Sequence, residues 1–308
     1  MSRFIRPCLL SCILGAAAVL SDRDAVLAQN TPPPDTPAVV VKGVTYTPRS
    51  ILARNMGSEA DRLEQFPPYK VAGNIYYIGT KTLSSFLITT AQGHILMDTT
   101  YEKNANVLAK SVADLGFKMS DIKIILGNHA HGDHMEGDAA IKAMTAGGAQ
   151  VTVMAEDVPA LEAMTPGGKA HPIDKILHDR DTVTLGGVTL TAHLTAGHTR
   201  GCTTYTTTVS EGGKSYNVVF SCSLRAPNTL TPPVIEEMTR SFSLVRKLPC
   251  DIQVGDHPAQ FQMYEKYERL KKAGPTGPNP FIDPLGCNLE TDIQEAMFKA
   301  VLGRTASR

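Results

Sequence analysis

Four potential metal ligands lie within six residues in the segment NHAHGDH, residues 128–134. They are His129, His131, Asp133 and His134, in a chain of 308 residues that has only nine histidines. Imidazole and carboxylate groups are good ligands for zinc. The segment alone fits a structural metal site, an oxidoreductase or a hydrolase, so the rest of the chain has to distinguish these.

The spacing of the four side chains indicates two metals rather than one. We expect the segment to form a loop after the apolar run 122–127, and not a helix. Alternate residues of an extended loop point the same way, so one metal can take both His129 and His131. Asp133 and His134 are adjacent, face a different direction and suit a second metal. Each metal then needs one more ligand from elsewhere.

Two remote histidines are placed to supply these ligands. His198 lies in the glycine-flanked segment TAGHTRG, and His257 lies in VGDHPAQ at the end of an expected strand. Strand ends are where sites of α/β proteins are usually built. No metal is assigned to the other histidines, which lie in expected strands or polar loops, at positions 94, 171, 178 and 193.

Strand-like and helix-like segments alternate along the chain. Strands are expected at 74–79, 85–90, 94–98, 122–127, 151–154, 183–186, 188–193, 204–209, 217–221 and 251–256. Helices are expected at 102–117, 136–148, 234–247, 260–272 and 289–302. The two halves are similar in style and no linker separates them. This predicts one layered α/β domain with helices outside and sheets inside.

Composition excludes several classes of partner. The 30 basic and 30 acidic residues cancel, which argues against an electrostatic grip on nucleic acid or an anionic membrane. Trp is absent and aromatic residues make up 6%, which disfavours a stacking platform for bases. We therefore expect a small-molecule substrate, no nucleic acid and no stable membrane partner. No heptad or interface stripe is visible, so a monomer is expected.

The N-terminus has the features of a signal peptide, assigned to residues 1–28. Arg3 and Arg6 precede the apolar run 8–20, which is too short to span a bilayer, and VLA ends at Ala28. A buried N-terminal helix is the alternative. Residues 29–64 begin QNTPPPDTP and are expected to form an extended arm, because consecutive prolines enter neither helices nor central strands. Residues 65–308 form the domain, which we expect to be periplasmic or secreted.

Four cysteines remain after residues 1–28 are removed, at positions 202, 222, 250 and 287. An even number in an exported chain indicates disulfide bonds, and four cysteines allow three pairings.

The order His-x-His-x-Asp-His, then Gly-His-Thr, then a late His resembles the metallo-β-lactamase fold, over about residues 65–305. The resemblance implies a four-layer αβ/βα sandwich with two Zn²⁺ ions. It matches one zinc site to His129, His131 and His198, and the other to Asp133, His134 and His257. The superfamily also contains glyoxalase II, lactonases, nucleases and iron-dependent sulfur dioxygenases, so the fold does not settle the reaction.

The segment between His198 and His257 separates these members. Glyoxalase-like proteins usually have a metal-bridging aspartate there, but no Asp or Glu occurs from Gly212 through Ile235. True metallo-β-lactamases lack that bridge. The chain resembles their third subclass, which has a second-site histidine beside the aspartate, as His134 is here. That subclass usually has a serine where the others have a zinc-binding cysteine, and Ser223 matches it best.

The cysteines can also be compared with those of the third subclass. Cys250 and Cys287, with the tail NPFIDPLGC, match the C-terminal disulfide of the third subclass. Cys222 is adjacent to Ser223, and adjacent strand residues face opposite ways, so Cys222 should face away from metals that Ser223 faces. A disulfide with Cys202 is preferred, and a free or zinc-binding Cys222 remains open.

The resemblance implies a β-lactamase that confers antibiotic resistance by hydrolysing the ring amide of penicillins, cephalosporins and carbapenems. A zinc-bound hydroxide would attack, with Asp133 as ligand of the second zinc and as the group that orients the hydroxide. Ser223 and Arg225 are expected to bind substrate. Arg225 departs from the usual serine, and its guanidinium suits the β-lactam carboxylate; a solvated surface arginine is the alternative. The rival functions are another di-zinc hydrolase, such as a lactonase or thioester hydrolase, and a non-catalytic exported zinc protein.

Overall fold

The computed structural model describes residues 36–227 and 229–306. These residues belong to one compact unit. The predicted signal peptide, residues 1–28, lies outside the described residues. Within the described part, no helix has the length and apolar character needed to cross a membrane.

Seven strands form the first sheet, in the order of the chain. They are β3 (Tyr69–Ala72), β4 (Ile75–Tyr77), β5 (Phe86–Thr90), β6 (Gly93–Met97), β7 (Ile122–Leu126), β8 (Gln150–Met154) and β9 (Lys175–Leu177). Neighbours are antiparallel from β3 to β6 and parallel from β6 to β9. The chain connects the parallel strands β6 to β9 through helices, because parallel neighbours need a long crossover connection.

Five strands form the second sheet, again in chain order. They are β10 (Thr182–Leu185), β11 (Val188–Leu194), β12 (Thr203–Glu211), β13 (Lys214–Ser221) and β14 (Ile252–Gly255). Only the last pair of this sheet, β13 and β14, is parallel. In that pair Ser221 lies opposite Gly255, so the two strands end side by side.

The main core lies between the two sheets, and a second core lies between the seven-stranded sheet and its helices. In β5, Phe86 and Ile88 belong to the first core while Leu87 belongs to the second. Both faces of the strand are therefore buried over residues 86–88, which explains the three consecutive apolar residues there, and the strand ends in the half-buried Thr89 and Thr90. The helices of the second core are α4 (Ala105–Asp114), α6 (Asp138–Met144) and α7 (Val158–Ala163).

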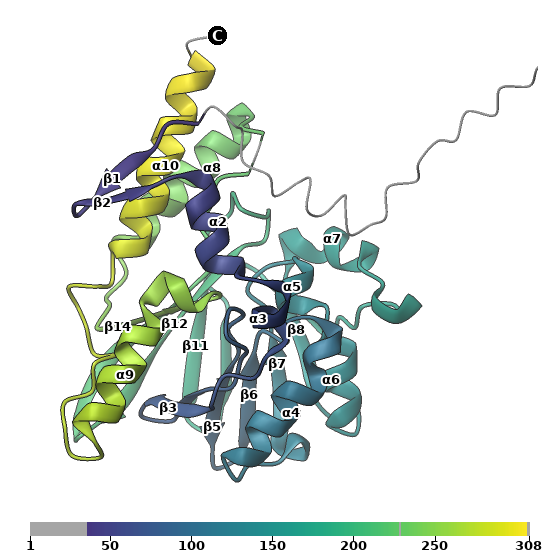
Figure 1. Ribbon diagram of the computed structural model, residues 1–308. Helices are drawn as coiled ribbons and strands as arrows, with labels where there is room; N and C mark the ends of the chain where they lie inside the picture. The colour runs from purple at the N-terminus through teal and green to yellow at the C-terminus, as the bar shows by residue number, and fades with distance from the viewer. Residues whose placement is uncertain (1–35, 228, 307–308) are drawn as a thin grey trace, which may run out of the picture. The chain divides into compact units, whose positions relative to one another are not determined.

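Three later helices lie outside the two sheets (Figure 1). They are α8 (Pro232–Val245), α9 (Met263–Ala273) and α10 (Leu289–Ala306). Phe242 of α8 packs against Phe298 of α10, with ring centroids 5.5 Å apart. The disulfide Cys250–Cys287 joins the start of β14 to the segment before α10. The predicted layered α/β fold, with sheets inside and helices outside, is confirmed.

The described part of the predicted extended arm has regular structure instead. A hairpin of β1 (Val39–Val41) and β2 (Val44–Tyr46) is followed by α2 (Pro48–Met56) and α3 (Glu59–Leu63). Both helices begin at capping boxes, at Thr47 and Ser58, which satisfy free N–H groups of the first turn. Tertiary packing then holds them, because α2 packs Ile51 against Ile293 and Met297 of α10. The prediction of an extended arm, which was based on the prolines, is therefore wrong for residues 39–63.

Strand direction brings the chain's candidate residues to one edge of each sheet. β6, β7 and β8 are parallel, so their carboxyl ends lie together. β11 and β13 are both antiparallel to β12, and β13 is parallel to β14, so the carboxyl ends of β11, β13 and β14 also lie together. The segments that follow these ends carry the site.

Candidate metal centre

His129, His131 and His198 form the first group of potential ligands. One nitrogen from each lies within 4.8 Å of the others. His129 follows β7, His131 is the N-cap of the short helix α5 (Gly132–Met135), and His198 lies in the turn after β11. The ring centroids are 4.8–4.9 Å apart. Three imidazoles at this separation form one face of a tetrahedral zinc site.

Asp133, His134 and His257 form the second group. Asp133 Oδ2 lies 3.4 Å from His134 Nε2 and 3.8 Å from His257 Nε2. The two groups adjoin, because the rings of His129 and His134 are 4.2 Å apart. One expectation is wrong: Asp133 and His134 lie in the helical turn α5, not in a loop. A turn of four residues is too short to show helical periodicity in the sequence.

The imidazole rings are held from behind. In three of them Nδ1 is engaged by an oxygen acceptor, which leaves Nε2 to face the centre. The pairs are His129 with the Asn128 side chain at 2.6 Å, His198 with the Arg225 carbonyl at 2.9 Å and His257 with the Thr82 carbonyl at 3.0 Å. His129 Nε2 is buried and has no hydrogen-bond partner among the described residues. A buried, unsatisfied nitrogen at this position fits a metal ligand.

Electrostatics suits five of the six ligands to a cation, and the sixth, His134, is paired with the Asp133 carboxylate. Burial lowers the pKa of four imidazoles and keeps them neutral, as metal binding requires: His129, His131, His198 and His257. Burial opposes ionisation of Asp133, but the adjacent His134 holds the pKa of that carboxyl well below its usual range. Burial also acts to lower the pKa of His134, but Asp133 raises it well above its usual value. Asp133 is therefore ionised at neutral pH.

The centre is open on one side. Its buried base consists of His129, His134 and His257. The partly exposed ligands are His131, Asp133 and His198. A hollow of about 360 Å³ adjoins the His198 turn, lined by Thr199, Arg200 and residues 155–157, 159 and 160, and none of the six ligands lines it. Because His131, Asp133 and His198 are themselves partly exposed, a small molecule can reach them from solvent.

Solved structures with this architecture are known. No model of a known protein family matches the sequence. The native FEZ-1 metallo-β-lactamase from Legionella gormanii is 37% identical, with a TM-score of 0.74 over 80% of this chain and 98% of that one. BJP-1 of Bradyrhizobium japonicum, a subclass B3 metallo-β-lactamase, is 32% identical, with a TM-score of 0.72 over 80% and 97%. SMB-1, a metallo-β-lactamase in complex with mercaptoacetic acid, is 34% identical, with a TM-score of 0.70 over 80% and 99%.

The chain belongs to the metallo-β-lactamase family. The resemblance predicted from the sequence is confirmed, including the likeness to the third subclass. The family consists of hydrolases, and the His and Asp donors of both groups fit zinc. The chain is a zinc hydrolase of this fold.

Two carboxylates that the sequence reasoning missed hold the ligand loops of this metallo-β-lactamase. Asp157, just after β8, accepts hydrogen bonds from Ala130 N at 2.8 Å and Gly201 N at 2.7 Å, so it ties the loop of His129 to the turn of His198. A side chain at residue 201 would collide with it, because a Cβ there would lie 2.6 Å from the Asp157 Cβ. Position 201 therefore requires glycine.

Asp98 is the second of these carboxylates. It follows β6 in the left-handed region at φ 60° and accepts a hydrogen bond from Asn128 N at 2.9 Å. Its other oxygen lies 3.7 Å from His134 Nδ1. Burial raises the pKa of Asp98 to about 6, against the opposing effect of His134. The sequence feature that could have identified Asp98 as a site residue is its position at the end of the apolar run HILMD.

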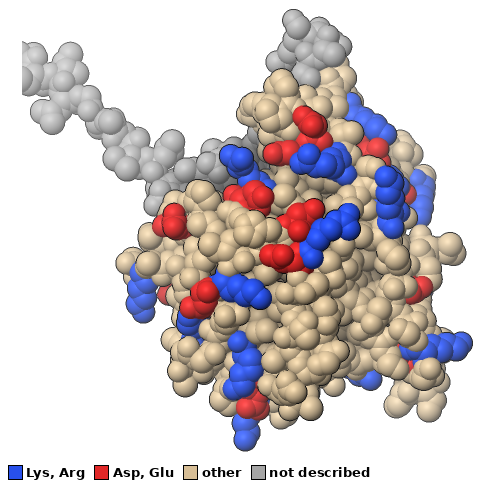
Figure 2. Space-filling model, turned by 180° about the vertical axis from the view of Figure 1, so that it is seen from behind, with Lys and Arg blue, Asp and Glu red and all other residues tan. Residues whose placement is uncertain are grey.

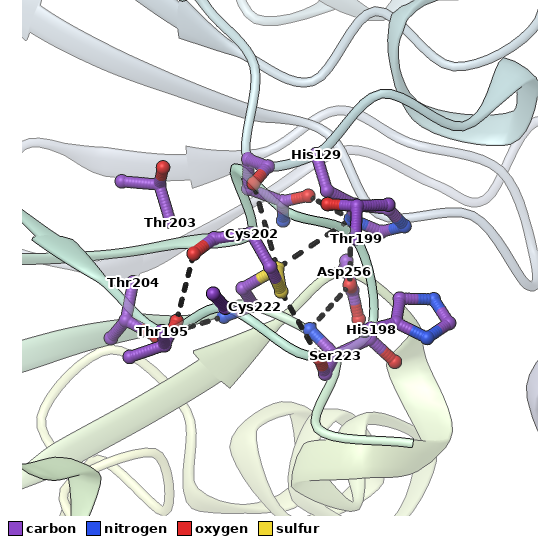
Figure 3. The surroundings of a disulfide bond; sticks show 12 residues. His129, Thr195, His198, Thr199, Cys202, Thr203, Thr204, Cys222, Ser223 and Asp256 are labelled. Carbon is purple, nitrogen blue, oxygen red and sulfur yellow. Dashed lines mark hydrogen bonds and ion pairs between the residues drawn. A yellow bond between two sulfur atoms is a disulfide. The ribbon is translucent and has the colours of Figure 1, made fainter. Parts of the chain in front are cut away.

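Cys202 and Cys222 form a buried disulfide beneath the first ligand group (Figure 3). This is the pairing preferred from the sequence, and the bond leaves no free Cys222 thiol to bind zinc. Cys222 Sγ still lies 3.6 Å from His129 Nδ1, on the side of the ring that faces Asn128. The cysteine therefore packs behind the ligand.

The two predicted substrate-binding residues are placed differently. Ser223 is buried; its N–H donates to Asp256 and its hydroxyl accepts from Gln260 Nε2 at 3.4 Å. Arg225 is partly exposed at the side of the His198 turn. Burial lowers the pKa of Arg225, while Asp133 and Asp256 act in the opposite sense. Its positive charge thus lies within electrostatic reach of the metal ligands.

Proposed function

We propose that this protein is a β-lactamase that hydrolyses the ring amide of penicillins, cephalosporins and carbapenems with two zinc ions. The observation that carries the proposal is the pair of adjoining ligand groups in one open centre. The absence of an acidic residue in 212–235, where glyoxalase-like members have their bridging aspartate, favours it over a lactonase or thioester hydrolase. The similar solved structures are metallo-β-lactamases, which also supports it.

In this proposal His129, His131 and His198 hold one ion, and Asp133, His134 and His257 hold the other. Zinc so bound lowers the pKa of a water toward 7 and polarises a carbonyl oxygen, which supplies nucleophile and Lewis acid together. The Asp133 carboxylate, ionised and partly exposed, accepts a hydrogen bond from the attacking water and orients it. Cys222 is locked in a disulfide, and no protein nucleophile or covalent intermediate is required.

Arg225 is proposed to bind the substrate carboxylate. β-Lactams carry this group beside the ring, and a guanidinium binds carboxylates with two parallel hydrogen bonds. Arg225 is partly exposed, and its carbonyl lies 2.9 Å from His198 Nδ1. Ser223 is proposed in a supporting role, since its N–H and hydroxyl both bond to the segment around His257.

Export to the periplasm, and with it resistance to the antibiotics, is part of the proposal. Two disulfides fit an oxidising compartment. On the face shown in Figure 2, Lys and Arg side chains are interspersed with Asp and Glu, and no large patch of one sign forms. This face offers no electrostatic grip to nucleic acid or anionic lipid, and the balanced formal charge of the chain agrees with that. We propose a monomer acting on small molecules.

A chromogenic cephalosporin assay, with and without a chelator, tests the proposal. The purified protein should hydrolyse the compound, lose activity with chelator and regain it with zinc. Penicillin and carbapenem turnover, measured by ultraviolet absorbance, extends the test. A zinc-loaded protein that cleaves none of the three classes would refute the proposal, and turnover of lactones or thioesters alone would favour the rival hydrolase.

A further inference from the structure

Asp256 is a buried carboxylate beside the metal ligands. We propose that Asp256 is a positioning residue: it lies behind His129 and His134, balances the charge of bound zinc and so strengthens metal binding without contacting the metal. The inference rests on the proposed metal-dependent function. It concerns zinc affinity and not the choice of substrate.

The register of two strands places Asp256 there. Ser221 of β13 pairs with Gly255 of the parallel strand β14, so Asp256 and Cys222 leave the sheet at the same edge. Asp256 Oδ2 accepts a hydrogen bond from Ser223 N at 2.9 Å, a contact drawn in Figure 3. The Asp256 carbonyl accepts another from Ser84 N at 3.0 Å. The residue is therefore held at both its main chain and its side chain.

Its other carboxylate oxygen has no structural partner. Asp256 Oδ1 is buried and makes no hydrogen bond among the described residues, and the side chain is fully inaccessible to solvent. A buried carboxylate with an unsatisfied oxygen is unfavourable unless a positive charge compensates it. A carboxylate oxygen of Asp256 lies within 4.8 Å of potential ligand nitrogens of both His129 and His134. A cation held by these histidines would supply the missing compensation.

The charge of the ligand set also favours a role for Asp256 in metal binding. Two divalent ions would bring four positive charges, and Asp133 is the single acid among the six proposed ligands. The segment after β13 offers no carboxylate. Asp256 supplies one from the neighbouring strand, at the same edge of the sheet. With Asp98, which lies 3.7 Å from His134 Nδ1, it forms a layer of negative charge under the histidines.

The geometry favours a position behind the ligands over direct coordination. Asp256 Oδ2 lies 3.5 Å from His129 Nδ1, and that nitrogen is turned toward Asn128 at 2.6 Å. The metal would bind Nε2, on the opposite side of the ring. Carboxylates behind a histidine ligand fix its orientation and raise its basicity, and their loss typically weakens metal binding about 10- to 100-fold.

The test is Asp256→Asn, which keeps an acceptor for Ser223 N and removes the charge. Asp251→Asn is the matched control, because Asp251 precedes the same strand and also accepts a backbone hydrogen bond, from Asn217 N at 2.8 Å. Zinc dissociation constants are measured by competition with a chromophoric chelator. D256N should bind zinc about 10- to 100-fold more weakly than wild type, and D251N should not.

Two further readouts separate this role from others. Metal-free D256N should melt no lower than metal-free wild type, because Asn keeps the acceptor for Ser223 N and the change removes a buried charge whose Oδ1 has no hydrogen-bond partner among the described residues. The cobalt-substituted protein should keep the absorption bands of its coordination geometry. Unchanged zinc affinity overturns the inference, altered cobalt bands make Asp256 a ligand and overturn it, and a lower metal-free melting temperature makes its role structural.

Failure of the two proposals is distinguishable because no β-lactam enters this experiment. A wild-type protein that binds zinc but cleaves no β-lactam refutes the proposed function alone, whereas a wild-type protein that binds no zinc refutes both. If D256N does not fold, Asp256→Ser is the second neutral variant, with the same expected loss. If neither variant folds without metal, Asp256 is structural and the inference is wrong.

Discussion

Removing the disulfide Cys202–Cys222 should weaken zinc binding, whereas removing Cys250–Cys287 should leave it unchanged. The two bonds are a matched pair for this purpose. Cys222 Sγ lies 3.6 Å from His129 Nδ1, and Cys202 lies four residues beyond His198. The other bond joins the start of β14, at the opposite end of that strand from His257, to the segment before α10.

The cost in stability can be worked from the loop that each bond closes. The sequence separations are 20 for Cys202–Cys222 and 37 for Cys250–Cys287. Loss of loop-closure entropy in the unfolded chain then gives about 3 kcal/mol for the first bond and about 4 kcal/mol for the second. Stability alone would therefore rank the second bond as the more important.

Zinc affinity should rank them in the opposite order. The first bond connects the segment after β13 to the segment after the His198 turn, and it packs behind His129. Its removal loosens two ligands of one group, so zinc binding should weaken about 10- to 100-fold, as for other groups behind metal ligands. The second bond constrains none of the six ligands directly.

Double alanine variants of each pair make the comparison. Urea unfolding in the presence of a chelator gives the free energies of unfolding, and competition with a chromophoric chelator gives zinc affinity. Equal loss of zinc affinity in both variants would show that metal binding merely follows global stability. Unchanged affinity without Cys202–Cys222 would show that the bond has no role at the centre. Either result would refute the reasoning.

Three further predictions follow from single side chains. Arg225→Ala should raise KM about 10- to 100-fold with little change in kcat, because a charge-assisted hydrogen bond contributes about 1.5–3 kcal/mol; unchanged steady-state kinetics would place Arg225 outside the substrate site. His257→Ala should remove the second zinc and leave the first, measured as metal content by mass spectrometry; full retention of both would exclude His257 as a ligand. Burial opposes the charge on His171, but Asp138, at 3.2 Å, raises the pKa of His171 above its usual value. The His171–Asp138 pair therefore stabilises the folded protein below about pH 6.5, and this stabilisation is lost as the pH rises through the raised pKa. The difference in free energy of unfolding between wild type and His171→Asn should therefore shrink at high pH, and a difference independent of pH would contradict this.

Local sequence was a good guide where periodicity and residue type carry the information. The run 122–126 became a strand that is buried on both faces except at the exposed Lys123, and its four apolar residues are the four that are buried. The longer helices were found for the same reason, with ends shifted by a few residues. The hairpin and helices of 39–63 were missed, because their caps are short signals and α10 provides much of their packing.

The sequence by itself determined the ligand chemistry, since NHAHGDH, His198 and His257 contain donors that suit zinc and follow expected strands. Only the tertiary structure decided which carboxylates lie behind those donors. Asp98, Asp157 and Asp256 act on ligands that are distant in the sequence, and strand direction and register bring them together. An aspartate at the end of a strand looks the same in a sequence whatever lies across from it. What it does depends on its neighbours in space.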